Sequence, residues 1–359
     1  METLSPLASK VACIATNIST DQSALLALKA RFVTGLESLA ALAIIDISNM
    51  DIVGTIPPQY NNLHFFSELQ ILILDNNGFT AIPPASISNL SKLETLSVSN
   101  NHLQGSFPKD IGNLLSLKEL VLVRNNLTGS ISFSIFNISS LETLALTYNQ
   151  LSGSLPADIK IKSITIISNQ LSGHIPASLS NCTQLYELSL SYNNFNGIIP
   201  PEIVNLEGLQ LLNLGGNHLQ DKKLNTSSWL LCVKIVSGII PAKIGNLRNL
   251  QQLQLENNGI VGSIPRSIRN MTSLWILNFK TNNLTGVIPK EIGKLHKLEK
   301  LYLQFNELSG SIPEELFNIS TLRRVSLSTN NLSGSLPLAF GYWPTNLQFL
   351  NLLEITSVE

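Results

Sequence analysis

The chain of 359 residues is long enough for two or three ordinary domains or for one long repeat array. Only 13% of its residues are charged and the net charge is −1, so it lacks the clustered Lys and Arg that bind nucleic acid. The three cysteines, Cys13, Cys182 and Cys232, are too few and too scattered to predict a disulfide framework or a zinc site.

The N-terminal residues do not follow the pattern of the rest. We expect 1–19 to be a disordered, non-repeat segment and 20–37 to be an incomplete N-terminal cap with a helix at Thr20–Phe32. Lys10 interrupts the segment where an export signal would need an apolar core, and the longest apolar run, Leu39–Ile45, is far shorter than the ~20 residues of a membrane span. Within the given sequence we predict neither an export signal nor a membrane anchor.

From residue 38 to residue 346 one pattern recurs, and a shortened copy occupies 347–359. In one copy Leu298, Leu301 and Leu303 precede Asn306, and Gly310 and Pro313 follow it. Such internal repetition identifies a repeat architecture, and we count 13 turns from Leu42 to Pro337. The asparagines recur every 24 residues in two runs, namely Asn77, Asn101, Asn125, Asn149 and Asn258, Asn282, Asn306, Asn330.

The chemistry of each repeated position predicts its place in a stacked coil. Alternating residues such as Leu301 and Leu303 form a short strand with one apolar face, which only neighbouring turns can bury. The asparagines are structural: an inward amide can bond backbone groups of adjacent turns and form a ladder. We therefore predict an α/β repeat solenoid, with a parallel sheet on a concave face and loops or 3-10 turns on the convex face. Thirteen turns spaced by about 4.8 Å give a face on the order of 60 Å long, which suits a peptide or protein ligand.

The register is irregular at several points. Asn149 and Asn169 are only 20 residues apart, so one turn is short by about four residues. After Asn217 the next residue in register is Lys234, 17 positions on, so we expect an irregular turn there. Met50 stands where the first ladder asparagine belongs.

The pattern LxxLxLxxNxLxGxIP resembles that of the plant-specific leucine-rich repeats and covers roughly 300 of the 359 residues. The segment Thr20–Lys29 resembles the N-terminal cap of plant receptor kinases. Asn137–Pro156 is most similar to ectodomains of pattern-recognition receptor kinases, a group that includes receptors for flagellin and elongation factor. The resemblance implies a right-handed leucine-rich-repeat superhelix that is secreted, glycosylated and held at the extracellular face of the plasma membrane, with a cytoplasmic Ser/Thr kinase.

The sequence departs from that family in two respects. The Trp-containing segment and cysteine pair that normally complete the cap are absent between Phe32 and Leu42. No Gly-rich phosphate loop and no kinase HRD or DFG sequence occurs in the 359 residues, so kinase activity would belong only to a longer parent protein. We expect a truncated or mis-spliced form of such a receptor, with a genuine short paralogue as the alternative.

Ligand contact is expected at outward residues that flank the inward strand positions, where exposed aromatic and charged side chains favour binding. The alternative for each is an ordinary solvated strand residue. The middle turns supply Glu119, Val121, Arg124, Tyr148, Glu187 and Tyr192. We select as ligand-binding residues Tyr192, Gln254, Glu256, Lys280, Tyr302, Phe305 and Arg324. We expect the last five, Glu256 to Arg324, to form one cluster, because successive turns place them side by side.

Asn-x-Ser/Thr motifs are frequent, although the repeat itself generates many of them. We predict glycosylation, if the chain is secreted, at Asn89, Asn126, Asn137, Asn181, Asn270, Asn283, Asn318 and Asn331. Asn17 and Asn225 carry the same motif.

No arrangement of residues predicts catalysis, a cofactor or a bound metal. The five histidines fall at unrelated repeat positions. The Gly215–Gly216 pair has no following helix to complete a phosphate site, so no function is assigned to it. Cys182 and Cys232 are separated by about two turns, which predicts free thiols.

The sequence therefore indicates a non-enzymatic binding module. The leading hypothesis is a receptor ectodomain that recognises a peptide or microbial protein and assembles with a co-receptor that has a leucine-rich-repeat ectodomain. The alternatives are a soluble inhibitor similar to leucine-rich-repeat proteins that block fungal wall-degrading enzymes, and a non-functional receptor fragment.

Overall fold

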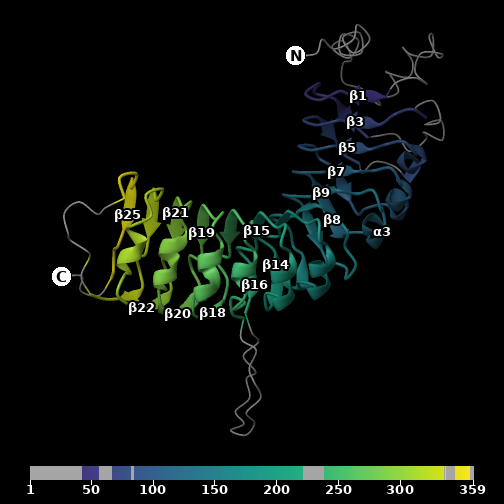
Figure 1. Cartoon of the computed structure of the whole chain (residues 1–359). Helices are drawn as coiled ribbons and strands as arrows, with labels where there is room; N and C mark the ends of the chain where they lie inside the picture. Colours follow the sequence, from purple (N-terminus) through teal and green to yellow (C-terminus); the bar gives the residue numbers. More distant parts are fainter. Residues whose placement is uncertain are drawn as a thin grey trace, which may run out of the picture. The chain divides into compact units, whose positions relative to one another are not determined.

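The computed structural model describes residues 43–55, 67–81, 85–220, 238–334, 336 and 344–355. The N-terminal segment and cap expected at 1–19 and 20–37 lie outside these residues. The described residues of the chain (Figure 1) belong to two compact units. The first unit contains those up to Pro156 and Ser163–Gln170, and the second contains Ala157–Lys162 and those from Leu171 onward. None of the helices in the described ranges has the length and apolarity that a membrane span requires.

Each unit contains a main parallel sheet to which successive turns contribute one short strand each. In the second unit Leu277 pairs in register with Leu253 on one side and Leu301 on the other, so the repeat spacing sets the strand register. The first unit has β1 (Ile44–Asp46), β3 (Ile71–Ile73), β5 (Thr95–Ser97), β7 (Glu119–Val121), β9 (Thr143–Ala145) and β11 (Ser163–Thr165). The second has β13 (Glu187–Ser189), β15 (Leu211–Asn213), β17 (Gln252–Gln254), β19 (Ile276–Asn278), β21 (Lys300–Tyr302), β23 (Arg324–Ser326) and β25 (Phe349–Asn351).

A second set of strands follows the ladder asparagines, where the sequence predicted only a turn. Gly286, the residue before the last in one of them, has φ +75°, a conformation that glycine adopts at little cost. These strands are β2 (Val53–Gly54), β4 (Gly78–Phe79), β6 (Gln104–Gly105), β8 (Asn126–Ser130) and β10 (Gln150–Ser152) in the first unit. In the second unit they are β12 (Ser172–His174), β14 (Asn194–Gly197), β16 (His218–Leu219), β18 (Val261–Gly262), β20 (Asn283–Val287), β22 (Glu307–Gly310) and β24 (Asn331–Leu332).

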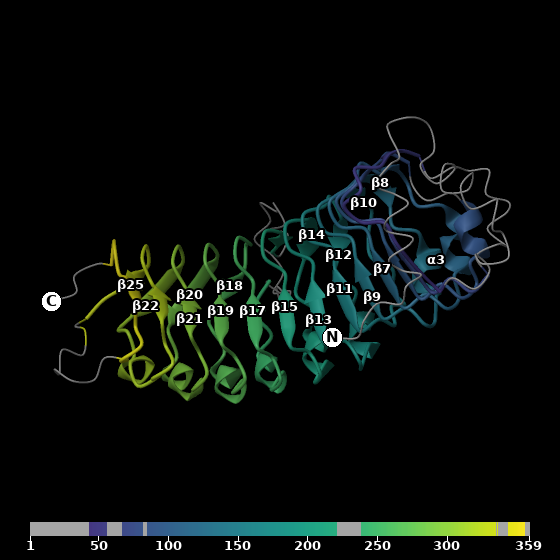
Figure 2. The same ribbon diagram turned by 90° about the horizontal axis from the view of Figure 1, so that it is seen from above.

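Short helices complete most turns, and Figure 2 shows those of the second unit following one another along one side. A proline commonly precedes them, as Pro289 does with φ −69°, which fits the first turn of a helix. The first unit has η3 (Ala85–Asn89), η4 (Lys109–Asn113) and α3 (Phe133–Phe136). The second has η5 (Ala177–Asn181), η6 (Pro201–Asn205), η7 (Ile244–Asn246), η8 (Arg266–Asn270), η9 (Lys290–Lys294) and η10 (Glu314–Leu316).

The apolar repeat positions form the core of each unit. Leu253, Leu277 and Leu301 are fully buried, at 0% exposure. Complete burial of such a side chain contributes about 1.5–3 kcal/mol, and only the stacking of neighbouring turns provides it. The expected strand face therefore exists in both units.

The repeated asparagines bond backbone groups of the turn that precedes them. The side chain of Asn282 accepts a hydrogen bond from the Ile260 N–H at 3.1 Å and donates to the Leu255 and Phe279 carbonyls at 3.0 and 3.1 Å. In the first unit Asn125 likewise accepts from Leu103 N–H, at 3.0 Å. All eight ladder asparagines are buried except Asn258, which is half-buried.

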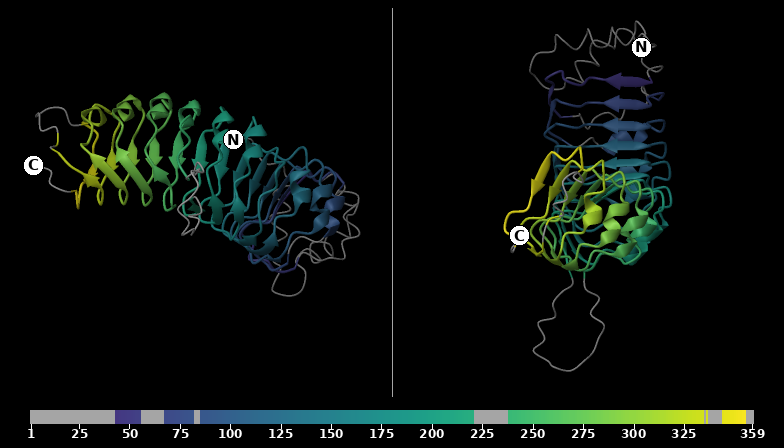
Figure 3. Two further views of the ribbon diagram at one scale, coloured as in Figure 1. Left: turned by 90° about the horizontal axis from the view of Figure 1, so that it is seen from below. Right: turned by 60° about the vertical axis from the view of Figure 1, so that its left-hand side comes forward.

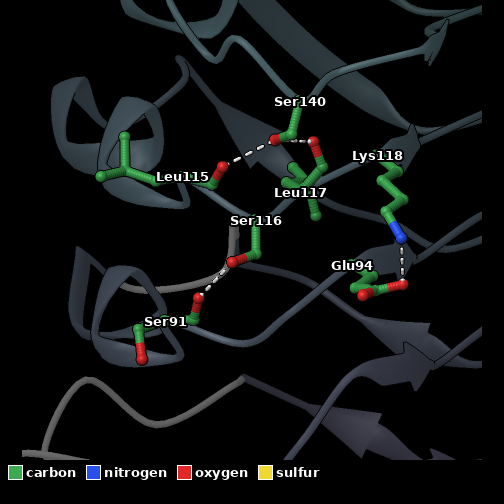
Figure 4. Close-up of polar contacts among 7 residues, drawn as sticks. All are labelled: Ser91, Glu94, Leu115, Ser116, Leu117, Lys118 and Ser140. Carbon is green, nitrogen blue, oxygen red and sulfur yellow. Dashed lines mark hydrogen bonds and ion pairs between the residues drawn. The ribbon is translucent and has the colours of Figure 1, made fainter.

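A column of hydroxyl groups adds a set of inter-turn bonds that the sequence analysis did not anticipate (Figure 4). Ser116 donates to the Ser91 carbonyl at 2.7 Å, and Ser140 donates to the Leu115 and Leu117 carbonyls at 2.7 and 2.8 Å. Each hydroxyl residue directly precedes the first leucine of its turn. This position therefore stabilises the stacking of turns.

The expected turn centred on Lys234 is wrong. Strand β15 pairs directly with β17, so no strand of an additional turn stands between them. Asn217 and Asn258 are 41 positions apart, which equals one 24-residue turn plus 17 residues. The stretch 221–237, which the structure does not describe, also contains 17 residues, so it accounts for the excess. Beyond that stretch the chain resumes in register, since Ile239 pairs with Val261 as Val287 pairs with Ser309. Up to β23 the described residues thus contain twelve main-sheet strands, and β25 is a thirteenth.

Candidate ligand-binding face

Figure 3 shows the strands of successive turns lying side by side. Because these strands pair in register, equivalent residues of successive turns form four columns on the strand face. The first and third strand columns are the first and third residues of each main-sheet strand. The inner and outer turn columns are the second and third residues after each strand. In the turn of β19 these positions are Ile276, Asn278, Lys280 and Thr281.

The outer turn column carries bulky exposed residues in an unusual backbone conformation. Tyr192 and Phe305 have φ of +54° and +59° and are 53% and 49% exposed. In the first unit Arg124 and Tyr148 occupy the same column with φ of +54° and +58°, and the Arg124 guanidinium lies 5.3 Å from the centre of the Tyr148 ring. This conformation costs a non-glycine residue about 1–2 kcal/mol. The conformation recurs at this position in most turns, for example at Asn257 and Thr281, so it belongs to the repeat. It is the exposed aromatic side chains that make the column a candidate binding surface.

The strand columns hold three of the selected residues. Arg324 is exposed, whereas Gln254 and Tyr302 are half-buried. The Gln254 amide donates to the side chain of Gln252 at 3.1 Å. Tyr302 lies in register between Asn278 and Ser326.

The inner turn column differs from the expectation of an outward, solvated row. Lys280 is half-buried, and Glu256, selected as an outward ligand-binding residue, is only 9% exposed. The expectation that Glu256 is an outward, solvated residue is therefore wrong, because its carboxylate packs over Gly215 of the preceding turn.

Burial leaves Glu256 in an unfavourable state. Its Oε2 atom is buried without a hydrogen-bond partner, and burial raises the pKa of its carboxyl group, while its own backbone N–H and the Lys280 charge act in the lowering direction. The other buried polar atoms without a partner in the described residues belong to Ser99, Ser191 and Gln304, all in the inner turn column. The buried side-chain oxygens without a hydrogen-bond partner in the described residues therefore all lie in the inner turn column.

The five residues expected to form one cluster lie on four successive turns and occupy four columns of the strand face. Glu256 and Lys280 are neighbours in the inner turn column, and Tyr302, Phe305 and Arg324 lie in the other three columns. The structure also brings Tyr192 and Glu256 to adjoining positions. Both side chains lie against the adjacent glycines Gly215 and Gly216.

The repeat seen in sequence and structure has matches among known families. Two family models described as leucine-rich repeat match this chain, one at residues 67–127 and 159–219 and the other at 140–160. A third model, described as leucine-rich repeat region, matches residues 230–359. The fold is a leucine-rich-repeat solenoid. No curated protein sequence is similar enough to count as a match.

Solved structures with the same fold include plant receptors. The plant peptide hormone receptor RGFR1, in complex with RGF2, has 29% identity and a TM-score of 0.71 over 87% of this chain and 55% of its own. The Arabidopsis receptor kinase HAESA, in complex with the peptide hormone IDA and the co-receptor SERK1, has 26% identity and a TM-score of 0.55 over 88% of this chain and 58% of its own. The present chain therefore spans little more than half the length of these receptor chains.

The same fold also occurs outside plants. An internalin (InlF) from Listeria monocytogenes has a TM-score of 0.68 over 99% of this chain and 91% of its own. At 22% identity this likeness concerns the fold alone.

A pocket at the start of the strands of the solenoid escaped the sequence analysis. Gln251, Ser273, Trp275, Lys297, Glu299 and Thr321 line an open cavity of about 620 Å³. The Lys300 ammonium lies 5.3 Å from the centre of the Trp275 ring. The signal was present in the sequence, since Trp275 stands just before a strand where most other turns carry charged or amide residues.

All eight asparagines selected for glycosylation are exposed on the solenoid. Asn17 and Asn225 lie outside the described residues. Cys182 is a buried free thiol whose pKa is raised by burial, and Cys13 and Cys232 are not described. Within the described ranges, no group of three or more metal-ligating side chains occurs.

Proposed function

We propose that this solenoid is the ligand-binding module of a plant cell-surface receptor and that it recognises a peptide, or an extended segment of a microbial protein, on its strand face. The observation that carries the proposal is the outer turn column, where Tyr192 and Phe305 are exposed in a left-handed conformation. Exposed aromatic side chains supply contact area at low entropic cost, and they favour peptide and protein ligands.

The comparisons support a peptide rather than a small metabolite. RGFR1 and HAESA were both solved with peptide ligands, and HAESA also with a co-receptor. By analogy, a second leucine-rich-repeat ectodomain is the proposed co-receptor, and immune or developmental signalling would follow in a longer parent protein. The flagellin and elongation-factor receptor class remains part of this proposal.

The proposal places the module outside the cell, at the plasma membrane. The exposure of all eight acceptor asparagines supports glycosylation there, because an enzyme could reach each of them. The chain expressed in plant cells behind an added signal peptide should carry glycans on several of these asparagines. Mass spectrometry of its peptides that detects no glycan would contradict this part of the proposal.

Site-specific photo-crosslinking tests the binding function. A benzoylphenylalanine replaces Tyr302 on the strand face, and in a control chain it replaces Arg269, which is exposed on η8. Each protein is irradiated with a library of synthetic biotinylated peptides. We expect cross-links from position 302 that excess unlabelled peptide suppresses, and none from position 269. Equal cross-linking at both positions, or none at either, would refute the proposed function.

A further inference from the structure

The open cavity of the second unit lies beside the strand face and not on it. Each lining residue stands either one or three positions before a main-sheet strand, so none belongs to the four columns. The lining comes from four successive turns, which at about 4.8 Å per turn extend over roughly 14 Å. A cavity of this length and of about 620 Å³ suits a short chain of linked rings better than one amino-acid side chain. We call it the edge cavity, lined by Gln251, Ser273, Trp275, Lys297, Glu299 and Thr321.

Trp275 gives the edge cavity a large apolar surface. Its side chain is half-buried, and the Lys300 ammonium over its ring does not line the cavity, so the indole borders the cavity away from Lys300. The indole N–H is neither buried nor bonded to any of the described residues. The two preceding turns carry Gln210 and Gln251 at the same position, so the stacking of turns does not require a tryptophan there. An indole that the fold does not need favours a role in binding.

Ser273 lacks the inter-turn hydrogen bond that its column forms elsewhere. In the first unit Ser140 bonds two carbonyl groups of the preceding turn. In the second unit Thr321 likewise donates to the His296 and Leu298 carbonyls, at 2.9 and 2.8 Å. Ser273 has no hydrogen-bond partner in the part of the chain that the structure describes, and its oxygen is not buried. The edge cavity therefore offers a hydroxyl group that the fold leaves unused.

The charges around the edge cavity favour an anionic ligand. Glu299, the acid of the lining, already lies 3.6 Å from the Arg323 side chain. Lys297 is exposed and pairs with no acid among the residues that the structure describes. The Lys300 ammonium adds a second positive charge beside Trp275. A carboxylate group on the ligand would therefore find an unpaired ammonium group in the lining and a positive potential around it.

We propose that the edge cavity binds an oligosaccharide of uronic acids, which are sugars whose six-membered ring carries a carboxylate. The C–H side of one ring packs against the Trp275 indole, and its carboxylate pairs with the Lys297 ammonium. Its hydroxyl groups form hydrogen bonds with Ser273 and Glu299.

The mixed lining selects this class of ligand. A sugar ring has an apolar C–H side and hydrogen-bonding groups around its edge, and the edge cavity presents an indole with polar groups beside it. A phosphate or sulfate group lacks the apolar side. An aromatic acid has no hydroxyl groups to donate to the Glu299 carboxylate. This binding goes beyond the proposed peptide recognition, because it uses a different surface.

Binding of two trisaccharides tests the proposal. Trigalacturonic acid carries three carboxylates, and its methyl ester keeps the rings and hydroxyl groups without the charges. The chain is produced without glycans, so that its own sugars, for example at Asn270, do not occupy the cavity. Saturation-transfer NMR measures dissociation constants up to about 10 mM. We expect a dissociation constant below about 1 mM for the acid and binding of the ester that is about tenfold or more weaker.

Two variants assign the binding to the edge cavity. Trp275→Gln introduces the residue of the preceding turn and should weaken binding of the acid about tenfold or more. Lys297→Gln should bind the acid no better than the ester. Lys290→Gln is the charge-matched control, because it removes an exposed lysine of η9 outside the cavity, and it should bind as the unchanged chain does. Circular dichroism confirms that each variant is folded.

The indole N–H signals locate the bound sugar. The chain has three tryptophans, and the signal that is missing in Trp275→Gln belongs to Trp275. We expect the acid to shift this signal. Equal binding of acid and ester, no binding of the acid up to about 10 mM, or equal losses in Lys297→Gln and Lys290→Gln would overturn the proposal. An unchanged Trp275 signal at saturating acid would overturn it as well. Cross-linking at position 302 tests peptide recognition independently of these outcomes.

Discussion

Replacing Asn282 with alanine measures how much one ladder asparagine stabilises the stacking of turns. The change leaves the Ile260 N–H without an acceptor, which costs about 1–3 kcal/mol in a buried position. The Leu255 carbonyl keeps a second donor, Asn258, and the Phe279 carbonyl keeps Asn306, so these lost bonds add only about 1 kcal/mol. The expected loss in the free energy of unfolding is therefore about 2–4 kcal/mol.

Asn283 provides a matched control, because it is the same residue type one position on and its side chain is exposed. Asn283→Ala should change the free energy of unfolding by less than about 0.5 kcal/mol. Urea unfolding followed by circular dichroism gives the global effect for both variants. Because turns of a repeat protein can open locally, hydrogen exchange of the Ile260 amide should also accelerate, by about 30-fold or more, in Asn282→Ala alone. Equal effects of the two substitutions would refute the ladder.

Three further predictions follow from the fold and from the buried titratable groups. Deleting 221–237 should preserve the circular dichroism spectrum and cooperative thermal unfolding, because β15 already pairs with β17; loss of cooperativity would contradict the register. Glu256→Gln should raise the free energy of unfolding at neutral pH by about 1 kcal/mol. Burial raises the pKa of Glu256 in the folded protein, so the ionised carboxylate destabilises the fold fully at pH values above that raised pKa. This destabilisation disappears as the pH falls below the ordinary pKa of glutamate. A stability difference between Glu256→Gln and the unchanged chain that persists at about pH 3.5 would contradict the burial of an ionised Glu256. Cys182, buried with a raised pKa, should react with iodoacetamide only after unfolding, as mass spectrometry of its peptide can check; rapid labelling of the native chain would contradict its burial.

Residues that have the same structural role in every turn could be predicted from the sequence. Asn282 recurs at a fixed spacing from Leu277, and a buried amide at that point can be satisfied in few ways, so its bonds to the preceding turn follow from the spacing. The inward leucines follow from strand alternation. The surroundings of the ladder asparagines and of the inward leucines come only from neighbouring turns, and these have the same sequence pattern.

Positions whose surroundings differ from turn to turn could not be predicted. Glu256 is buried because Gly215 in the turn before leaves room for it. Its Oε2 atom lacks a donor, and the nearby N–H of Lys280 bonds the Asn278 side chain instead. Neither effect appears in the pattern of a single repeat. The false turn had a different cause, because Lys234, together with the residues after it, imitates the second half of the repeat.

Hydrogen exchange with and without a cross-linked library peptide tests the central claim, that the strand face is the binding surface. The account predicts slower exchange on binding in Gln252–Gln254 and Lys300–Tyr302, with no change in the helices Arg266–Asn270 and Lys290–Lys294. Protection of the two helices, with the two strands unchanged, would contradict it.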